Sequence, residues 1–299
     1  MLIAGACLAL GTAQLGMPYG VANVTGKPAP DVARDMVGAA LAAGVRQFDT
    51  SRHYGDSEIV LGAALADLDP AGSARVTSKL PSDVDAADAG AVLAAAAESV
   101  RRLGRPLDAL LLHDEAALDG WEAGVGRAME GVLDAGLAGA LGVSVYSLSR
   151  ARQALGIPIL TRLQLPSSVL DRRFARDGAF DAAARRGVAV AVRSVFLQGL
   201  LLMPADRLPV RLDAARPYVA RFQACAAALG LSPAMAALGF ARAMWPDACL
   251  VVGAETREQL TDNIRAVAVP LPDAAVAALG RAFDVVPETV VNPCLWPKT

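Results

Sequence analysis

Four side chains suited to proton transfer follow three consecutive apolar segments of this 299-residue sequence. Asp49 ends the first segment and Tyr54 comes shortly after it, while Lys79 and His113 end the second and third segments. If the three segments are neighbouring parallel strands, their carboxyl ends meet at one edge of the sheet. We therefore expect an acid, a phenol, an ammonium group and an imidazole to share one pocket.

The chemistry expected of this set is proton donation by a phenol. A phenol has an unperturbed pKa of about 10 and is a poor acid at pH 7. An ammonium group beside it favours the phenolate, so Lys79 is expected to lower the pKa of Tyr54. Asp49 would hold the ammonium in place, and His113 would orient a carbonyl oxygen. The set would protonate an oxygen that gains negative charge when its carbon receives hydride.

Each of these residues also has a purely structural interpretation. Asp49 could cap the following helix, Tyr54 could be a rim aromatic, and His113 could be a hydrogen-bonded core histidine. Lys79 is harder to explain in this way, because it is one of three lysines and follows an apolar segment. Burying an ammonium there is costly without a partner, and Asp49 is the obvious one. The occurrence of all four on adjacent segments favours a shared site.

The elements that position these residues alternate regularly along the chain. Serine, aspartate or proline starts the expected helices and glycine often ends them. Short apolar runs predict eight strands, at residues 7–11, 45–49, 75–79, 107–113, 139–144, 160–165, 188–194 and 248–253. Longer amphipathic runs predict eight principal helices, at residues 30–44, 57–67, 88–103, 122–135, 148–155, 177–186, 234–245 and 257–267.

This alternation predicts one α/β domain over residues 1–299, a closed (β/α)8 TIM barrel. Short, nearly continuous apolar strands suit a parallel sheet covered by helices. A doubly wound sheet is the alternative, but residues 11–16 lack the GxGxxG spacing of its usual dinucleotide turn. Residues 16–29, residues 196–212 and the tail from about residue 285 are expected to be irregular.

Composition and charge exclude several classes of protein. Apolar residues make up 54% of the chain, which excludes a wholly disordered protein. The formal charge is −2 and there is no basic stripe, so nucleic acid is not an expected partner. No apolar run reaches the roughly 18 residues of a membrane span, and the first residues lack the basic start of a signal peptide. We expect a soluble cytoplasmic protein.

The cysteines and histidines predict neither a disulfide framework nor a metal site. Cys7, Cys225, Cys249 and Cys294 form no CxxC pair and lie among apolar residues. Buried free thiols in a reducing compartment are therefore expected. Two histidines are too few for a usual histidine-rich metal site.

Three motifs resemble the aldo-keto reductase superfamily. The segment FDTSRHYGDSEIVLG, residues 48–62, resembles the family signature around its catalytic Asp and Tyr. Residues 78–79 resemble the family's lysine strand, and residues 110–113 resemble its histidine strand. The resemblance runs from about Gly11 to Asn263, in the expected order of motifs.

This resemblance implies an (α/β)8 barrel that reduces a small aldehyde or ketone with NADPH or NADH. Position by position, Tyr54 would be the general acid and Lys79 would depress its pKa. Asp49 would pair with Lys79, and His113 would help to position the carbonyl group. These roles agree with those expected from the chemistry of the side chains.

The resemblance also implies where the nicotinamide half of the cofactor lies. Ser144 and Gln164 would contact the nicotinamide amide, although Val145 stands where the family often has Asn. Arg193 stands where many members stack an aromatic ring on the nicotinamide, and could stack or reach a phosphate instead. Further positions line the pyrophosphate or the edge of the pocket: Thr12, Gln14, Ser194, Leu197 and Gly199.

The adenosine half would lie against residues 252–263. Gly253 would allow backbone approach to a phosphate at a helix start, and Asn263 would contact the adenine. Gln259 stands where the family commonly pairs an Arg with the 2′-phosphate of NADP. Arg257 could replace that arginine, whereas Glu255 would repel the phosphate. Family habit favours NADP(H), and NAD(H) stays open.

The substrate side is less well defined by the sequence. His53 would face either the substrate mouth or solvent. Trp296 is a candidate apolar wall, because the tail closes the substrate side in this family. Two alternatives to a carbonyl reductase stay open: a cofactor-binding sensing or regulatory barrel, and a dehydrogenase that oxidises a sugar or alcohol. The oligomeric state is not predicted.

Overall fold

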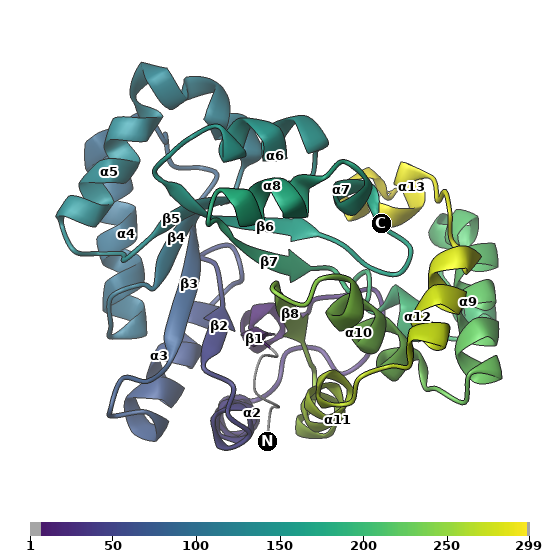
Figure 1. The fold of residues 1–299 in the computed structure, drawn as a ribbon. Coiled ribbons are helices and arrows are strands. Elements are labelled where there is room, and N and C mark those ends of the chain that lie inside the picture. Colours follow the sequence, from purple (N-terminus) through teal and green to yellow (C-terminus); the bar gives the residue numbers. More distant parts are fainter. Residues whose placement is uncertain (1–6, 298–299) are drawn as a thin grey trace.

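The strands form a closed parallel barrel in a computed structural model that describes residues 7–297 (Figure 1). Each strand pairs in parallel with the next one along the chain, and β1 pairs with β8 to close the ring. The predicted barrel is confirmed. The strands are β1 (Leu8–Gly11), β2 (Gln47–Asp49), β3 (Arg75–Leu80), β4 (Ala109–Leu112), β5 (Leu141–Ser144), β6 (Leu160–Pro166), β7 (Ala189–Arg193) and β8 (Cys249–Gly253).

All eight predicted helices are present around the barrel. One of them begins later than predicted, because Gly124 adopts φ 142° within a π-helical turn (Trp121–Val125). The helices are α2 (Pro30–Ala42), α3 (Ser57–Leu68), α4 (Ala89–Leu103), α5 (Gly126–Asp134), α6 (Leu148–Leu155), α8 (Ala179–Arg185), α10 (Pro233–Met244) and α11 (Arg257–Ala268).

Two further long helices, α9 (Arg216–Ala228) and α12 (Asp273–Ala282), were not predicted. They contact each other outside the barrel, at the right of Figure 1. Short helices are α1 (Ala13–Gly16), α7 (Arg173–Arg176) and α13 (Glu288–Val291). The remaining turns are 3-10 helices, η1 (Glu115–Gly120), η3 (Leu200–Leu202), η4 (Ala205–Arg207), η5 (Val210–Ala215) and η6 (Pro293–Leu295).

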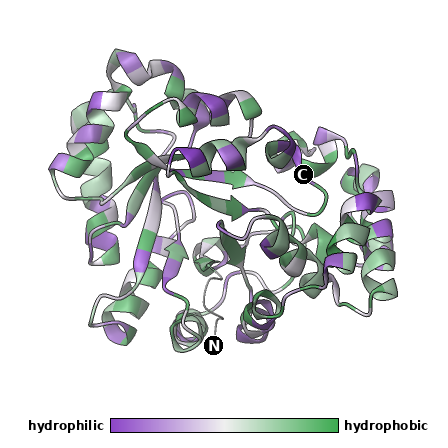
Figure 2. Ribbon diagram, viewed as in Figure 1, coloured by the Kyte–Doolittle hydropathy of each residue, from purple (hydrophilic) through white to green (hydrophobic). Residues whose placement is uncertain are grey.

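The hydrophobic core lies between the strands and the inner faces of the helices. Every residue of β4 and β5 is buried, and Figure 2 shows hydrophobic strands surrounded by helices of mixed character. Aliphatic side chains such as Leu10, Leu110 and Leu141 pack with Phe48 and Phe240 from different parts of the chain. Burial on both faces explains why the strands could be recognised as continuous apolar runs.

The prediction of four free thiols is wrong, because Cys7 and Cys249 form a disulfide. Leu8 of β1 lies opposite Leu250 of β8, so the residues just before them are also neighbours. This pairing lies at the amino-terminal ends of the strands, the floor of the barrel. The inference of a reducing compartment rested on four free thiols, and two of these cysteines are joined in the disulfide. Cys225 is half-buried and Cys294 is exposed.

Among residues 7–297, no single helix has the length and hydropathy needed to cross a membrane. Two consecutive helical segments, Val210–Ala228 and Pro233–Met244, meet those requirements only as a pair bent by 89°. The signal-peptide prediction rests on the first thirteen residues, of which residues 1–6 lie outside the described residues. Residues 298–299 of the predicted domain also lie outside them.

Candidate active site

A cavity of about 600 Å³ opens at the carboxyl ends of the strands, the mouth of the barrel. It brings together three of the four predicted catalytic residues on its lining, Asp49, Tyr54 and His113. Most of the predicted cofactor positions also line it: Thr12, Gln14, Ser144, Gln164, Arg193, Ser194, Gly199, Gly253, Gln259 and Asn263. Lys79 lies directly behind the lining, bonded to Asp49.

A buried ion pair forms the base of the cavity. Lys79 Nζ lies 2.7 Å from Asp49 Oδ1 and also donates to the carbonyl oxygen of Thr50 at 2.9 Å. The Lys79 side chain is 1% exposed and that of Asp49 is 7% exposed. Gln164 donates to the other Asp49 oxygen at 2.6 Å. Both charges are thus compensated inside the protein, as burial of an ion pair requires.

Tyr54 lies over this ion pair, with Lys79 Nζ 4.9 Å from the centre of its ring. The loop after β2 carries Tyr54 and packs closely against α1. A Cβ added to Gly16 would lie 1.8 Å from the Tyr54 carbonyl oxygen, so only glycine permits this approach. The fit of α1 against the loop therefore fixes the backbone of the phenol.

The pKa of Tyr54 is shifted in the direction opposite to the predicted one. Burial raises the pKa of Tyr54 well above its usual value, and the negative charge of Asp49 raises it further. The lowering expected from Lys79 does not prevail, because Asp49 compensates the ammonium charge at 2.7 Å. Tyr54 therefore keeps its proton at neutral pH.

His113 faces Tyr54 across the cavity as a neutral imidazole. The two rings meet edge to face with centres 6.0 Å apart, and His113 Nδ1 lies 3.2 Å from Ser51 Oγ. Burial, followed by the charge of Lys79, lowers the pKa of His113 to about 3. A neutral imidazole can hydrogen-bond a carbonyl oxygen without adding another positive charge.

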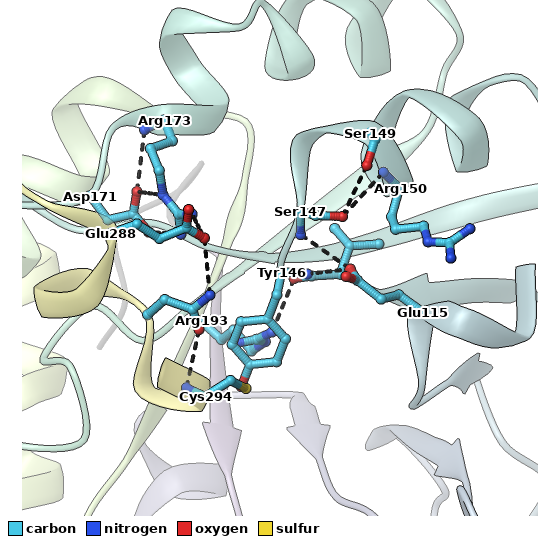
Figure 3. Close-up of polar contacts among 12 residues, drawn as sticks. Glu115, Tyr146, Ser147, Ser149, Arg150, Asp171, Arg173, Arg193, Glu288 and Cys294 are labelled. Atoms are coloured by element: carbon cyan, nitrogen blue, oxygen red, sulfur yellow. Dashed lines mark hydrogen bonds and ion pairs between the residues drawn. The ribbon is translucent and has the colours of Figure 1, made fainter. Parts of the chain in front are cut away.

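The wall formed by β5, β6 and β7 contains polar groups with and without hydrogen-bond partners. Gln164 Oε1 is buried without a hydrogen-bond partner among the described residues. Ser144 Oγ accepts from Arg193 Nε at 3.3 Å, and the Arg193 guanidinium lies 3.9 Å from the centre of the Tyr146 ring (Figure 3). Arg193 is thus held on one face by Tyr146 and still lines the cavity.

The loop after β7 exposes backbone to the cavity through unusual dihedral angles. Ser194, Leu197, Gln198 and Gly199 all have positive φ. Ser194, Gln198 and Gly199 line the cavity, so a ligand there would meet backbone in this conformation. Leu197 does not contribute a donor, because its side chain is buried in the core and its N–H donates to the Ser194 carbonyl oxygen at 2.9 Å.

The connection between β1 and α2, residues 17–29, forms another wall of the cavity. Val21 N–H donates to the Gln198 carbonyl oxygen at 3.0 Å, in the loop after β7. Thr25 Oγ1 donates to Glu255 Oε2 at 3.0 Å, in the turn after β8. This connection therefore contacts two other strand ends.

The end of the cavity near α11 differs from the prediction in one respect. Glu255, Gln259 and Asn263 line it, but Arg257 does not. Arg257 instead forms an ion pair with Asp35 of α2, because α2 and α11 are neighbours. The expected replacement of the phosphate-binding arginine by Arg257 is therefore not what the structure shows.

Two residues expected on the substrate side lie elsewhere. His53 Nε2 accepts from the backbone N–H of Ser82 at 2.8 Å, and the side chain does not line the cavity. Trp296 is buried and donates to the Val290 carbonyl oxygen within the tail. An indole that packs beneath its own segment cannot also form a wall of the cavity.

Sequence reasoning missed several cavity residues, among them the two aromatic residues Tyr19 and Tyr146. Tyr146 follows β5 closely, a position that could have marked it, and Tyr19 lies in the segment expected to be irregular. The tail does reach the mouth, but through Cys294, which lies beside the Tyr146 hydroxyl in Figure 3. An ion pair between Arg173 and Glu288 of α13 helps to hold the tail there.

Comparisons with known proteins agree with this arrangement. The model of the aldo/keto reductase family matches residues 7–283. A glycerol dehydrogenase from Gluconobacter oxydans superposes with a TM-score of 0.73 at 21% identity, covering 97% of each chain. A candidate aldo-keto reductase from Pseudomonas aeruginosa gives a TM-score of 0.65 at 21% identity, covering 87% of this chain and 89% of its own.

Proposed function

The chain belongs to the aldo/keto reductase family, and we propose that it reduces the carbonyl group of a small aldehyde or ketone with a nicotinamide dinucleotide. The observation that carries this proposal is the buried Lys79–Asp49 pair beneath the ring of Tyr54. This pair supports the assignment of Tyr54 as a protonated phenol at the base of the cavity. A carbonyl oxygen that acquires negative charge there would need a proton.

The residues around the cavity fit a nicotinamide dinucleotide. The unpartnered Gln164 Oε1 can accept a hydrogen bond from a carboxamide N–H, as buried acceptors require. The positive-φ residues Ser194, Gln198 and Gly199 line the part of the cavity where a diphosphate would lie. A nicotinamide supplies or accepts hydride when it is bound. The chain's own residues supply orientation, proton transfer and exclusion of water.

In the proposed reduction, Tyr54 donates its hydroxyl proton to the former carbonyl oxygen. Lys79 and Asp49 hold the ring from below, and His113 directs the carbonyl oxygen with its ring nitrogen. The raised pKa of Tyr54 means that the proton is present before each turnover.

The variant Tyr54→Phe tests the proposal. Removing the proton donor should lower turnover about 100- to 10,000-fold while nucleotide affinity changes little. Loss of reduced-nucleotide absorbance with a panel of aldehydes, ketones and sugars measures turnover, and nucleotide fluorescence measures binding. Tyr19→Phe, which removes a second phenol from the lining, should reduce turnover far less.

Two results would contradict the proposal. Full activity of Tyr54→Phe would remove Tyr54 from its assigned role. Tight nucleotide binding by the wild-type protein without turnover of any carbonyl compound would instead indicate a sensing or regulatory barrel.

A further inference from the structure

The cavity carries negative charge at its α11 end. Glu255 and Asp262 line it there, beside the neutral side chains of Gln259 and Asn263. We propose that the site binds NAD(H) in preference to NADP(H), and that Glu255 sets this preference. This inference rests on the proposed function, because it concerns the nucleotide that the reaction uses.

The order of groups along the cavity places the adenosine at this end. The reacting end is fixed by Tyr54 and the Lys79–Asp49 pair. The positive-φ segment after β7 and the backbone of Gly253 follow at the ends of β7 and β8, and Ser194, Gly199 and Gly253 line the cavity there. A dinucleotide that runs outward from Tyr54 across these strand ends brings its adenosine ribose to the residues after β8.

The arginine at the start of α11 and two backbone donors at this end are already engaged. Arg257 Nη1 lies 2.9 Å and 3.1 Å from the two carboxylate oxygens of Asp35. The backbone N–H of Glu255 donates to Gln259 Oε1 at 2.8 Å. The N–H of Gln259 donates to Thr256 Oγ1 at 3.2 Å. The start of α11, ordinarily an anion site, is therefore capped by its own side chains.

Glu255 offers the complementary group for a free ribose hydroxyl. Thr25 donates to Glu255 Oε2, which leaves Oε1 as an acceptor. In doubly wound dinucleotide-binding folds, which differ from this barrel, a carboxylate accepts from the 2′-hydroxyl of NAD and an arginine accommodates the 2′-phosphate of NADP. Glu255 offers the same carboxylate chemistry here. A 2′-phosphate beside Glu255 would meet like charge instead, with no partner charge to offset it.

Two cations line the cavity within residues 7–297, and neither belongs to the α11 end. Arg193 is stacked on Tyr146 near the reacting end. Arg207 lies in η4, which follows β7. Arg207 is thus the residue that could still reach a phosphate, and its substitution belongs in the test.

Dissociation constants of NADH and NADPH for the substrate-free protein test the proposal without any turnover. The wild type should bind NADH about tenfold to hundredfold more tightly, the range of one charge-assisted hydrogen bond. Glu255→Gln should remove most of this ratio, mainly by tightening NADPH. Glu258→Gln is the matched control, because Glu258 is exposed in the first turn of α11, three residues after Glu255, and does not line the cavity, so it should leave the ratio unchanged.

Equal or tighter binding of NADPH by the wild type would overturn this inference and leave the proposed function standing. Selective loss of NADPH affinity in Arg207→Ala would then identify the phosphate partner. An unchanged ratio in Glu255→Gln, with NADH binding retained as proof of folding, would also overturn it. Failure of both nucleotides to bind the wild type would refute the proposed function itself.

Discussion

The mouth and the floor of the barrel use buried polar groups differently. At the mouth, Lys79, Asp49 and Gln164 are bonded to one another, yet Gln164 Oε1 has no partner. At the floor, just before β3, both carboxylate oxygens of Asp69 are occupied by Ser73, Ala74 and Arg105.

The pKa of Asp69 also reflects the hydrogen bonds that it accepts at the floor. Burial alone would raise the pKa of Asp69, but hydrogen bonds from Ser73, Arg105 and Ala74 hold it well below its usual range. At Asp69 the floor therefore uses its acceptors for stability, although Arg105 Nε is buried there without a partner among the described residues. The mouth keeps some unused, which is what a ligand requires. The difference separates the binding end of the fold from its purely structural end.

The largest expected effect on stability is at the floor. The Cys7–Cys249 disulfide joins residues 242 positions apart, and the chain-entropy model gives roughly 5 kcal/mol for such a loop. Cys7→Ser should lower the free energy of unfolding by about this amount, measured by denaturant titration, while turnover of the folded protein is unchanged. Cys225→Ser is the control, since Cys225 is not in the disulfide. Equal stabilities of the two variants would show that the bond contributes nothing.

A change at the mouth should affect both stability and activity. Lys79→Met leaves Asp49 buried without its counter-ion, which costs about 3–5 kcal/mol and removes the cation beneath Tyr54. Denaturant titration and turnover should both register the change. Arg101→Gln breaks a pair with Glu98 that solvent screens, so it should leave stability almost unchanged. If the two variants were equally stable, the buried pair would not be the structural base of the mouth.

A third effect depends on pH, involves His113 at the mouth, and is smaller per pH unit than the two effects above. The pKa of His113 is about 3 in the folded protein against 6.5 in the unfolded chain, so the unfolded chain binds more protons between these values. Stability should therefore fall as pH drops from 6.5 toward 3, by up to about 1.4 kcal/mol per pH unit. The variant His113→Asn should flatten this dependence in denaturant titrations at several pH values. An identical slope in the variant would assign the dependence to other groups.

Much of the barrel and of its reacting end could be predicted from the sequence. All eight strands lie within two residues of their predicted bounds, because strands buried on both faces are continuous apolar runs. The spacing of Asp49, Tyr54, Lys79 and His113 follows from strand ends, so topology alone brings them together. The direction of the Tyr54 pKa shift could not be predicted, since it depends first on how deeply the phenol is buried and then on the nearby charge of Asp49.

The features that escaped prediction depend on contacts between distant segments. Pairing of Cys7 with Cys249 needs the register of the first strand against the last. The position of Arg257 needs the knowledge that Asp35 of α2 lies beside α11. Trp296 satisfies its indole N–H within its own tail, which no spacing reveals. In each case the partner is far along the chain or is chosen by local backbone geometry.

The bond between Cys7 and Cys249 also gives the chain the topology of a ring, with a free arm beyond residue 249. A protease that cuts once inside the ring, for instance at the 92% exposed Val24, opens it without releasing a fragment. The nicked molecule would keep its full mass on a denaturing gel and divide in two only after a thiol reagent is added.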